Sequence, residues 1–393
     1  MVRADNLWLP MISDGNIDGA VEEVNSTHHW HNHHTPNKCT AWVEETRPER
    51  IKDLRQTMID GFVQAPFKVK PRYDPSAEKW RDTNEPQQYP DQYIHHAVIR
   101  ALMPVMMRGM DKYCCGSIRG RGSEHGRGSI SGWMQHDPKG TKYCLQCDIR
   151  QFYPSLKPEV VMDRMRHLVK DARVLDIIWR IVKDGVKIGA FPSQWFANTT
   201  LQPLDHLIRE GGYGVTHYLR NMDNFTIFSS NKRKLRKLRA VIEAWLNERG
   251  LQLKDDWQIF QTGRDIPNKA PRHQRGRRPS AVGYRYGHGY TIPRKRNLLR
   301  MKRQASRYRK RRDSGKRISV KMAAGLISRI GQLKHCNNHN LYRLVLQGER
   351  LQRELKNIIR ANARRREYLT WSTFLEQRAR SRSLKPRAAN TPA

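Results

Sequence analysis

The sequence has few acidic residues for its length, few cysteines and no long apolar run. Its 393 residues include 37 Asp and Glu against 74 Lys and Arg, so the formal net charge is +37 at pH 7. A cationic excess of this size predicts a polyanionic partner, most simply RNA or DNA, with an anionic membrane surface as the rival. Hydrophobic residues make up only 37% of the chain, because so many positions are charged.

These absences exclude several classes of protein. No run of about 18 apolar residues occurs, and residues 1–10 lack the basic start and apolar core of a secretory signal. Six cysteines in so long a chain do not make a disulfide framework, and the adjacent Cys114 and Cys115 fit a reducing compartment. We therefore expect an intracellular protein with no membrane partner, long enough for two or three domains or lobes.

Two strand-like stretches each carry one conspicuous carboxylate. Residues 143–149 form an apolar run that contains Asp148 near its end, and residues 217–230 carry Asp223 in a similar setting. A carboxylate at the end of a buried strand is costly to desolvate unless it meets a cation, so a metal ion is expected nearby. If the two strands are neighbours, their carboxylates lie together and could hold a pair of divalent ions.

Both helices and strands are predicted along the rest of the chain. Apolar residues recur at helical spacing in residues 17–24, 49–62, 91–110 (kinked or broken near Pro104), 158–186, 196–208, 232–249, 294–312, 320–333 and 340–363. Further strand material is expected in residues 67–72, 251–260 and 280–292, the last as a hairpin around Gly287 to Gly289. Residues 262–278 are turn-rich and basic, which indicates an exposed insertion.

The glycine-rich segment 116–132 has two interpretations. It contains Arg119, Arg121 and Arg127 among its glycines. It is either a flexible linker or a loop whose glycines let the backbone and the arginines approach phosphate groups.

The histidine and cysteine clusters of the sequence are interpreted without a bound metal. The run from His28 to His34 could bind zinc, but it lacks the paired spacing of known zinc sites, so we prefer a polar loop or a patch facing nucleic acid. Cys144 and Cys147 form a C-x-x-C pair, yet strand alternation sends them to opposite faces and no second pair exists. We expect both cysteines to be small core residues.

Several motifs, taken in chain order, resemble those of reverse transcriptases over roughly residues 70–344. CDIRQFYPSL at 147–156 resembles motif A, and IGAFPSQ at 188–194 resembles motif B. RNMDNFTIF at 220–228 resembles motif C, and VGYRYGHGY at 282–290 resembles the primer grip of motif E. The resemblance implies an α+β right-hand polymerase fold, with fingers, a palm built on an antiparallel sheet, and a helical thumb.

The same resemblance divides the chain into lobes. It implies an N-terminal extension and helix (1–65), fingers (66–140), a palm segment with motif A (141–160), helices of the fingers and palm with motif B (161–200), a palm with motifs C, D and E that includes the insertion 262–278 (201–292), a basic helical thumb (293–350), and a C-terminal helix with a disordered tail (351–393).

Roles for individual residues also follow from the resemblance. Asp148 and Asp223 would be catalytic, and with the backbone carbonyl of Ile149 they would hold two Mg²⁺ ions, with Mn²⁺ as a possible substitute. Nucleotide binding would fall to Lys79, Arg81, Tyr153 (the steric gate against ribonucleotides), Gly189 and Gln194, with Lys254 as a possible proton donor. The primer grip would be Gly283, Tyr284 and Arg285, and the nucleic-acid backbone would contact Arg294, Lys295, Arg296, Arg300, Lys302 and Arg303.

The form of motif B narrows the resemblance further. The pattern from Ile188 to Gln194 is similar to that of reverse transcriptases from diversity-generating retroelements. Such an enzyme would use template RNA, a primer and dNTPs to make cDNA in the cytoplasm of a bacterial or phage-infected cell, aided by a small basic accessory protein. Reverse transcriptases of phage-defence systems, which work with a structured noncoding RNA, share much of the pattern and remain the alternative.

Motif C departs from the family pattern. Its second acidic position is Asn224, and the preceding tyrosine position is Asn221. The resemblance implies that the first aspartate, here Asp223, is the direct ligand, so two ions could still bind, though more weakly with one negative charge fewer. The reaction would be in-line attack of a primer 3′-hydroxyl on the dNTP α-phosphorus. The alternative is a catalytically weak or dead subunit that only binds RNA.

Overall fold

The chain divides into two compact units, the first from the N-terminus to Tyr290 and the second from Thr291 onward. The computed structural model describes residues 3–31, 37–74, 79–263, 276–337 and 349–367. Among these residues, no helix is long and apolar enough to cross a lipid bilayer.

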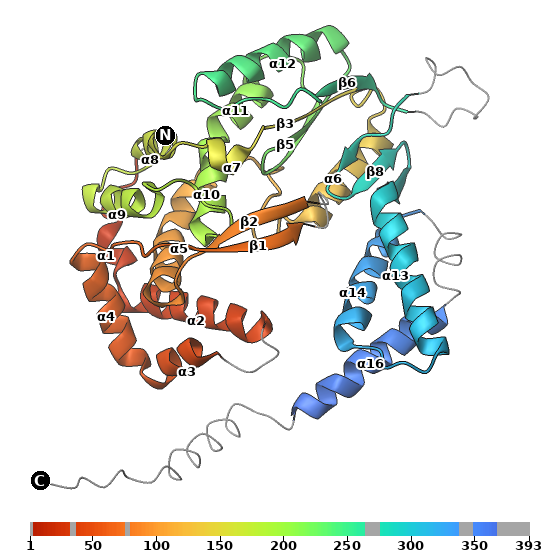
Figure 1. Ribbon diagram of the computed structural model, residues 1–393. Coiled ribbons are helices and arrows are strands. Elements are labelled where there is room, and N and C mark those ends of the chain that lie inside the picture. The colour runs from red at the N-terminus through yellow and green to blue at the C-terminus, as the bar shows by residue number, and fades with distance from the viewer. Residues whose placement is uncertain (1–2, 32–36, 75–78, 264–275, 338–348, 368–393) are drawn as a thin grey trace, which may run out of the picture. The chain divides into compact units, whose positions relative to one another are not determined.

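A four-stranded antiparallel sheet organises the first unit (Figure 1). It contains β3 (Tyr143–Asp148), β4 (His217–Asn221), β5 (Asn224–Ser229) and β6 (Gln258–Gln261) in the order β4-β5-β3-β6. The inner strands are therefore β3 and β5, which pair so that Asp148 lies opposite Asn224. We call this sheet the palm sheet.

Two strands predicted for the palm sheet differ from those observed. Residues 217–230 form not one strand but two, because Met222 adopts the left-handed conformation (φ 57°) and turns the chain back. The strand expected over 251–260 begins only at Gln258, although Leu253 forms an isolated bridge with Ile149. As a result, the β4–β5 turn and the Leu253 bridge both lie next to the end of β3.

The two faces of the palm sheet have different neighbours. Helix α12 (Lys232–Asn247) packs on β3, β5 and β6 through four fully buried residues, Leu235, Leu238, Ile242 and Leu246. Leu145 and Cys147 of β3 belong to the same core, so they point towards α12. Because side chains alternate along a strand, Gln146 and Asp148 point to the opposite face.

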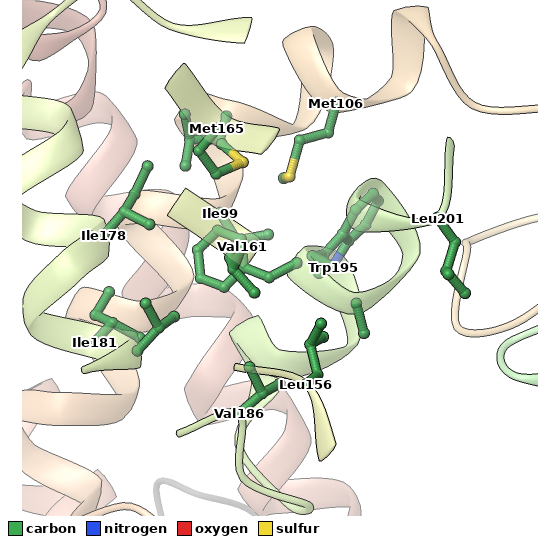
Figure 2. Close-up of a cluster of buried hydrophobic side chains, with 14 of the residues drawn as sticks. Ile99, Met106, Leu156, Val161, Met165, Ile178, Ile181, Val186, Trp195 and Leu201 are labelled. Carbon is green, nitrogen blue, oxygen red and sulfur yellow. The ribbon is translucent and has the colours of Figure 1, made fainter. Parts of the chain in front are cut away.

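Helices around α5 form the largest part of the core. The order is α1 (Trp8–Met11), α2 (Asp14–His31), α3 (Lys38–Glu45), α4 (Arg47–Ile59), α5 (Tyr93–Arg108, preceded by the π-helical turn Gln88–Gln92), then α7 (Phe152–Ser155), α8 (Pro158–Leu168), α9 (Ala172–Val182), α10 (Phe191–Thr200) and α11 (Gln202–Glu210). Figure 2 shows the cluster in which Ile99 of α5, Val161 and Met165 of α8, Ile178 of α9 and Trp195 of α10 meet.

Three helix predictions require correction. Helix α5 is not broken at Pro104 but continues to Arg108; Pro104 lies exposed, while Leu102, Val105 and Met106 pack into the core on either side of it. Residues 158–186 form two helices, because Asp171 caps α9 by accepting a hydrogen bond from the Arg173 N–H. Residues 196–208 likewise belong to two helices, which meet at Leu201.

The glycine-rich segment is part loop and part helix, and residues 116–122, with Arg119 and Arg121, lie outside helices and strands, so the loop interpretation still applies to them. Most of it forms α6 (Ser123–His136), which packs against β4 and β8 and fully buries Ile130 and Met134. A Cβ on Gly126 would lie only 3.0 Å from Cys115 Sγ, so the glycine permits a close approach of the helix. Tertiary packing here outweighs the low helix propensity of glycine.

Two smaller sheets complete the strands of the structure. β1 (Lys68–Asp74) and β2 (Lys79–Glu85) pair as an antiparallel hairpin. β7 (Ser280–Ala281), β8 (Tyr284–Gly287) and β9 (Tyr290–Pro293) form a three-stranded sheet, and the turn expected around Gly287 to Gly289 is confirmed.

The second unit is a helical module, as the sequence predicted. It contains α13 (Lys295–Asp313), α14 (Val320–Gly331), the short 3₁₀ helix Gln332–His335 and α16 (Glu349–Glu367). Its own core is built from Met301, Ala305, Tyr308, Ala323, Leu326, Ile330, Leu333, Leu351 and Leu355.

Candidate active site

Asp148 and Asp223 lie side by side at one end of the palm sheet. Asp148 is the last residue of β3, and Asp223 occupies the turn between β4 and β5. The Ile149 N–H donates a hydrogen bond of 3.2 Å to the Asp223 carbonyl, which holds the two strand ends together. The sheet register therefore brings together two carboxylates that are 75 positions apart in the sequence.

The carboxyl group of Asp148 has a raised pKa. Burial and then the charge of Asp223 raise its pKa to about 6, although the nearby Lys254 ammonium acts in the opposite direction. Its Oδ2 accepts a hydrogen bond from Lys254, whereas its Oδ1 is buried and has no hydrogen-bond partner within the described parts of the chain. A buried, unsatisfied carboxylate oxygen beside a second carboxylate is a suitable ligand for a cation.

This donor set fits a magnesium site completed by substrate. No cluster of three or more His, Cys, Asp or Glu side chains that could hold a metal exists among the residues the structure describes. Mg²⁺ commonly binds proteins through one or two carboxylates and takes its other ligands from water and substrate phosphates. The carboxylates of Asp148 and Asp223 meet that requirement.

The side chain of Asn224 forms its hydrogen bond with Asp223 and not with Asp148. Its Nδ2 donates a hydrogen bond of 3.0 Å to Asp223 Oδ1, and its own side chain is exposed. The amide thus helps to orient Asp223, and it adds no negative charge to the pair.

Lys254 is held close to Asp148 by main chain as well as side chain. The Lys254 N–H donates to the Asp148 carbonyl at 2.9 Å, and its ammonium forms an ion pair with the Asp148 carboxylate. The residue expected as a proton donor therefore lies in the site, where its charge partly neutralises the acidic pair.

Tyr153 borders the same carboxylates. It lies in α7, immediately after the buried Phe152, and its side chain is partly buried. Burial and the charge of Asp223 raise its pKa above the ordinary tyrosine value, so its hydroxyl stays protonated and close to Asp223. The ring is thus placed where it could limit the space beside the acidic pair.

Motif B packs against the strand that carries the expected triphosphate ligands. The Asn84 N–H in β2 donates to the Ile188 carbonyl at 2.6 Å. Gly189 has φ 108°, and a Cβ there would lie 2.8 Å from the Asn84 carbonyl oxygen, so only glycine fits this turn. Gln194 is exposed on α10, and Arg81 is partly exposed on β2. Of Lys79 only the backbone, in β2, is described.

The expected primer grip joins the face of the palm sheet that carries Asp148. Gln146 exchanges two hydrogen bonds with the Ser280 backbone, of 2.9 and 3.2 Å. Further along, the Tyr284 hydroxyl donates to Glu124 of α6 at 2.9 Å, and Gly283 turns the chain with φ 92°. Arg285 is partly exposed.

The cations expected to follow a nucleic-acid backbone lie in the second unit. Arg294, Lys295, Arg296, Lys302 and Arg303 are exposed, and Arg300 is partly exposed. They surround the buried stripe Met301, Ala305 and Tyr308 of α13. Most of the basic insertion 262–278 and the side chains of the His28 to His34 run lie outside the described residues.

A buried ion pair that involves the first residue of motif C was missed by the sequence analysis. Arg220 of β4 and Asp205 of α11 have fully buried side chains and interact through two contacts of 2.6 and 2.7 Å. Arg220 also donates to the Met222 carbonyl at 3.1 Å and to both oxygens of Asn198. An arginine directly after Tyr218 and Leu219 in a strand-like stretch was the available signal, but its partners are not adjacent in sequence.

Comparison with known proteins finds a family match for part of the chain. Residues 84–261 match the family model described as reverse transcriptase (RNA-dependent DNA polymerase). The expected fold class is thereby confirmed, an α+β right-hand polymerase fold with antiparallel sheets. No curated protein matches the chain.

Solved structures of telomerase resemble the chain only distantly. Candida albicans telomerase in complex with the TWJ fragment of telomeric RNA is 10% identical, with a TM-score of 0.43 over 81% of this chain and 64% of that one. Apo telomerase from Candida tropicalis, truncated from its C-terminal domain, is 13% identical, with a TM-score of 0.39 over 60% of this chain and 57% of that one. The chain thus spans less than two thirds of either telomerase.

Proposed function

We propose that the chain copies a cognate RNA into cDNA at Asp148 and Asp223, from the premise that residues 84–261 match the reverse transcriptase family. The family is an RNA-dependent DNA polymerase, so the predicted enzyme class, a nucleotidyltransferase, is confirmed. The observation that carries the assignment of the site is the buried, unsatisfied Oδ1 of Asp148 next to the Asp223 carboxylate.

The proposed site uses two Mg²⁺ ions, with Mn²⁺ as a substitute. Asp148, Asp223 and the Ile149 carbonyl would hold them, and the ions would supply activation of the primer 3′-hydroxyl and stabilisation of the departing pyrophosphate. Lys254, already bonded to Asp148, is placed to carry a proton towards that pyrophosphate. Tyr153 would exclude a 2′-hydroxyl, and the support is that it is partly buried and that the charge of Asp223 acts on its hydroxyl.

The proposed nucleotide site lies between motif B and the β1–β2 hairpin. The Asn84 to Ile188 hydrogen bond ties these two elements together, which would let Arg81 and Lys79 contact the triphosphate while Gln194 contacts the base. The primer terminus would rest on Gly283, Tyr284 and Arg285, and the duplex backbone on the basic residues of α13.

The proposed biological setting is a diversity-generating retroelement in a bacterial or phage-infected cytoplasm. The support is the form of motif B from Ile188 to Gln194, and the partners would be the template RNA and a small basic accessory protein. A phage-defence enzyme with a structured noncoding RNA is the second candidate. A nearby repeat pair that differs at adenines would support the first, and an adjacent noncoding RNA gene without repeats the second.

A primer-extension assay on an RNA template with Mg²⁺ and dNTPs tests the catalytic proposal. Asp223→Ala should abolish product, because the acidic pair loses one of its two charges. Asp256→Ala is the matched control, since it removes an exposed carboxylate for which the structure shows no ion pair, and it should retain wild-type activity. Absence of product from the wild type, or full activity in Asp223→Ala, would contradict the proposal in favour of an RNA-binding subunit.

A further inference from the structure

A dense group of cations covers the first half of α12, on the side of the palm sheet away from Asp148. Lys232, Arg233, Lys234, Arg236 and Lys237 all have exposed side chains. Leu235 and Leu238, between them in sequence, are fully buried against the sheet, so the helix holds the cations on a fixed support. We call these five residues the α12 basic face.

The α12 basic face has no partner within the protein. None of its five side chains forms an ion pair or hydrogen bond in the part of the chain that the structure describes. The contrast with later residues is clear, because Arg239 pairs with Glu243 at 2.7 Å and Arg249 with Glu248 at 3.1 Å. These two arginines also lie over the rings of Trp257 and Trp245 respectively.

The positions of these cations lower the stability of helix α12. Three of them, Lys232, Arg233 and Lys234, occupy the first turn of the helix, where the macrodipole favours negative charge and where no acidic residue is present. The pairs 232/236 and 233/237 also put like charges four residues apart on the helix surface. The helix forms because Asn231 caps it and because its opposite face is buried. Such an arrangement becomes favourable when an anion binds.

The chemistry of the surface indicates a polyphosphate and not a protein. Large exposed hydrophobic side chains among the described residues include Val69, Trp80 and Leu299, and none lies on α12. Stable protein interfaces need a buried apolar or aromatic centre, whereas contacts to a nucleic-acid backbone need closely spaced cations. The basic face extends about 8 Å along the helix axis, from the rise of about 1.5 Å per residue, which suits about three phosphate groups.

From these observations we propose that the α12 basic face is a second binding surface for RNA, which takes a backbone segment of the template molecule outside the catalytic site. Asp148 points to the opposite face of the palm sheet from α12, so a short primer–template duplex at the acidic pair does not contact the basic face. A longer RNA could contact both. The identity of the RNA as template rests on the proposed function, but the binding surface itself does not.

The test compares two variants that lose the same charge. In the first, Arg233, Arg236 and Lys237 of the basic face become glutamine. In the control, Arg166, Lys170 and Lys183 become glutamine, since all three are exposed and lie on or beside α8 and α9. Circular dichroism melting establishes that both variants fold.

Binding of a long, mixed-sequence single-stranded RNA is measured by fluorescence anisotropy over a range of salt concentrations. We expect weaker binding by the first variant, with a slope of log affinity against log salt that is smaller by about two, from about 0.7 per phosphate contact for three contacts. The control variant should keep the wild-type slope. Primer extension on a short duplex should be the same for all three proteins.

Two results would overturn the proposal. An unchanged slope in the first variant would show that RNA does not use this face, which would leave an acidic protein as the remaining partner. Equal losses in both triple variants would show a simple effect of net charge. Because anisotropy needs no catalysis, a wild type without polymerase activity would contradict the proposed function and leave this test intact.

Discussion

The fully buried Arg220 offers the most demanding test of how the acidic pair is held in place. Each of its five N–H groups has an acceptor: Asp205 Oδ1 and Oδ2, Asn198 Oδ1, the Asn198 carbonyl and the Met222 carbonyl. Burial would lower the pKa of the Arg220 guanidinium, but the charge of Asp205 raises it above its ordinary value, so the pair stays ionised. Met222 directly precedes Asp223, which connects this network to the site.

Arg220→Lys keeps the charge but leaves at most three donors for five acceptors. Because Asp205 Oδ1 also accepts from the Tyr218 hydroxyl, one of the other four acceptors is left without a donor, which gives a loss of about 1–3 kcal/mol in the free energy of unfolding. Asp205→Asn should cost about 3–5 kcal/mol, because it leaves the Arg220 charge uncompensated in the core.

Chemical unfolding followed by near-ultraviolet circular dichroism measures these losses. Arg180→Lys is the matched control, because Arg180 pairs with Asp176 at 2.6 Å on the surface of α9 and should lose less than about 0.5 kcal/mol. Under conditions where Arg220→Lys is still folded, its activity should require more Mg²⁺, since the Met222 turn is released. A loss of less than about 1 kcal/mol, or the same Mg²⁺ requirement as the wild type, would refute this reasoning.

Three further outcomes are expected. In metal-free protein the pKa of Asp148 is raised from 3.8 to about 6, so between these pH values the native state holds a proton that the unfolded state releases. The free energy of unfolding should therefore fall as the pH rises through that window. In a urea titration, Mg²⁺ should reverse this loss. Gly189→Ala should lower stability by about 1–3 kcal/mol in thermal unfolding, because a Cβ would meet the Asn84 carbonyl at φ 108°. Tyr153→Ala should increase ribonucleotide incorporation in single-nucleotide extension, and unchanged discrimination would remove Tyr153 from the nucleotide site.

The sequence predicted the parts of the fold that depend on local periodicity. An apolar run indicated β3, a glycine-rich turn between strand-like stretches indicated the β8–β9 hairpin, and helical spacing indicated α12 and α13. The pairing of Asp148 with the Asp223 region was also expected, because each residue follows an apolar strand and the resemblance placed both strands in one sheet. These features follow from side-chain patterns within a few residues of each other.

What could not be predicted depends on contacts between distant segments. Helix α6 forms despite its glycines because Gly126 lets it approach Cys115, which no local propensity reveals. Helix α5 passes through Pro104 because neighbouring residues pack into a core supplied by α2 and α10. The role of Arg220 required knowledge that Asp205 and Asn198 lie beside it, 15 and 22 positions earlier in the chain.

The inner position of β3 has a consequence for the lifetime of the site. The backbone of β3 is paired with β5 on one side and with β6 on the other, so its amide hydrogens exchange slowly unless the sheet itself opens. The β6 ladder ends at Gln146, and beyond it Asp148 is held by its pairing with Asn224 and by the hydrogen bond from the Lys254 N–H, so opening of the strand end would have to break these contacts. Because the two carboxylates lie together in the protein by itself, the proposed copying reaction would begin when nucleic acid and nucleotide bind.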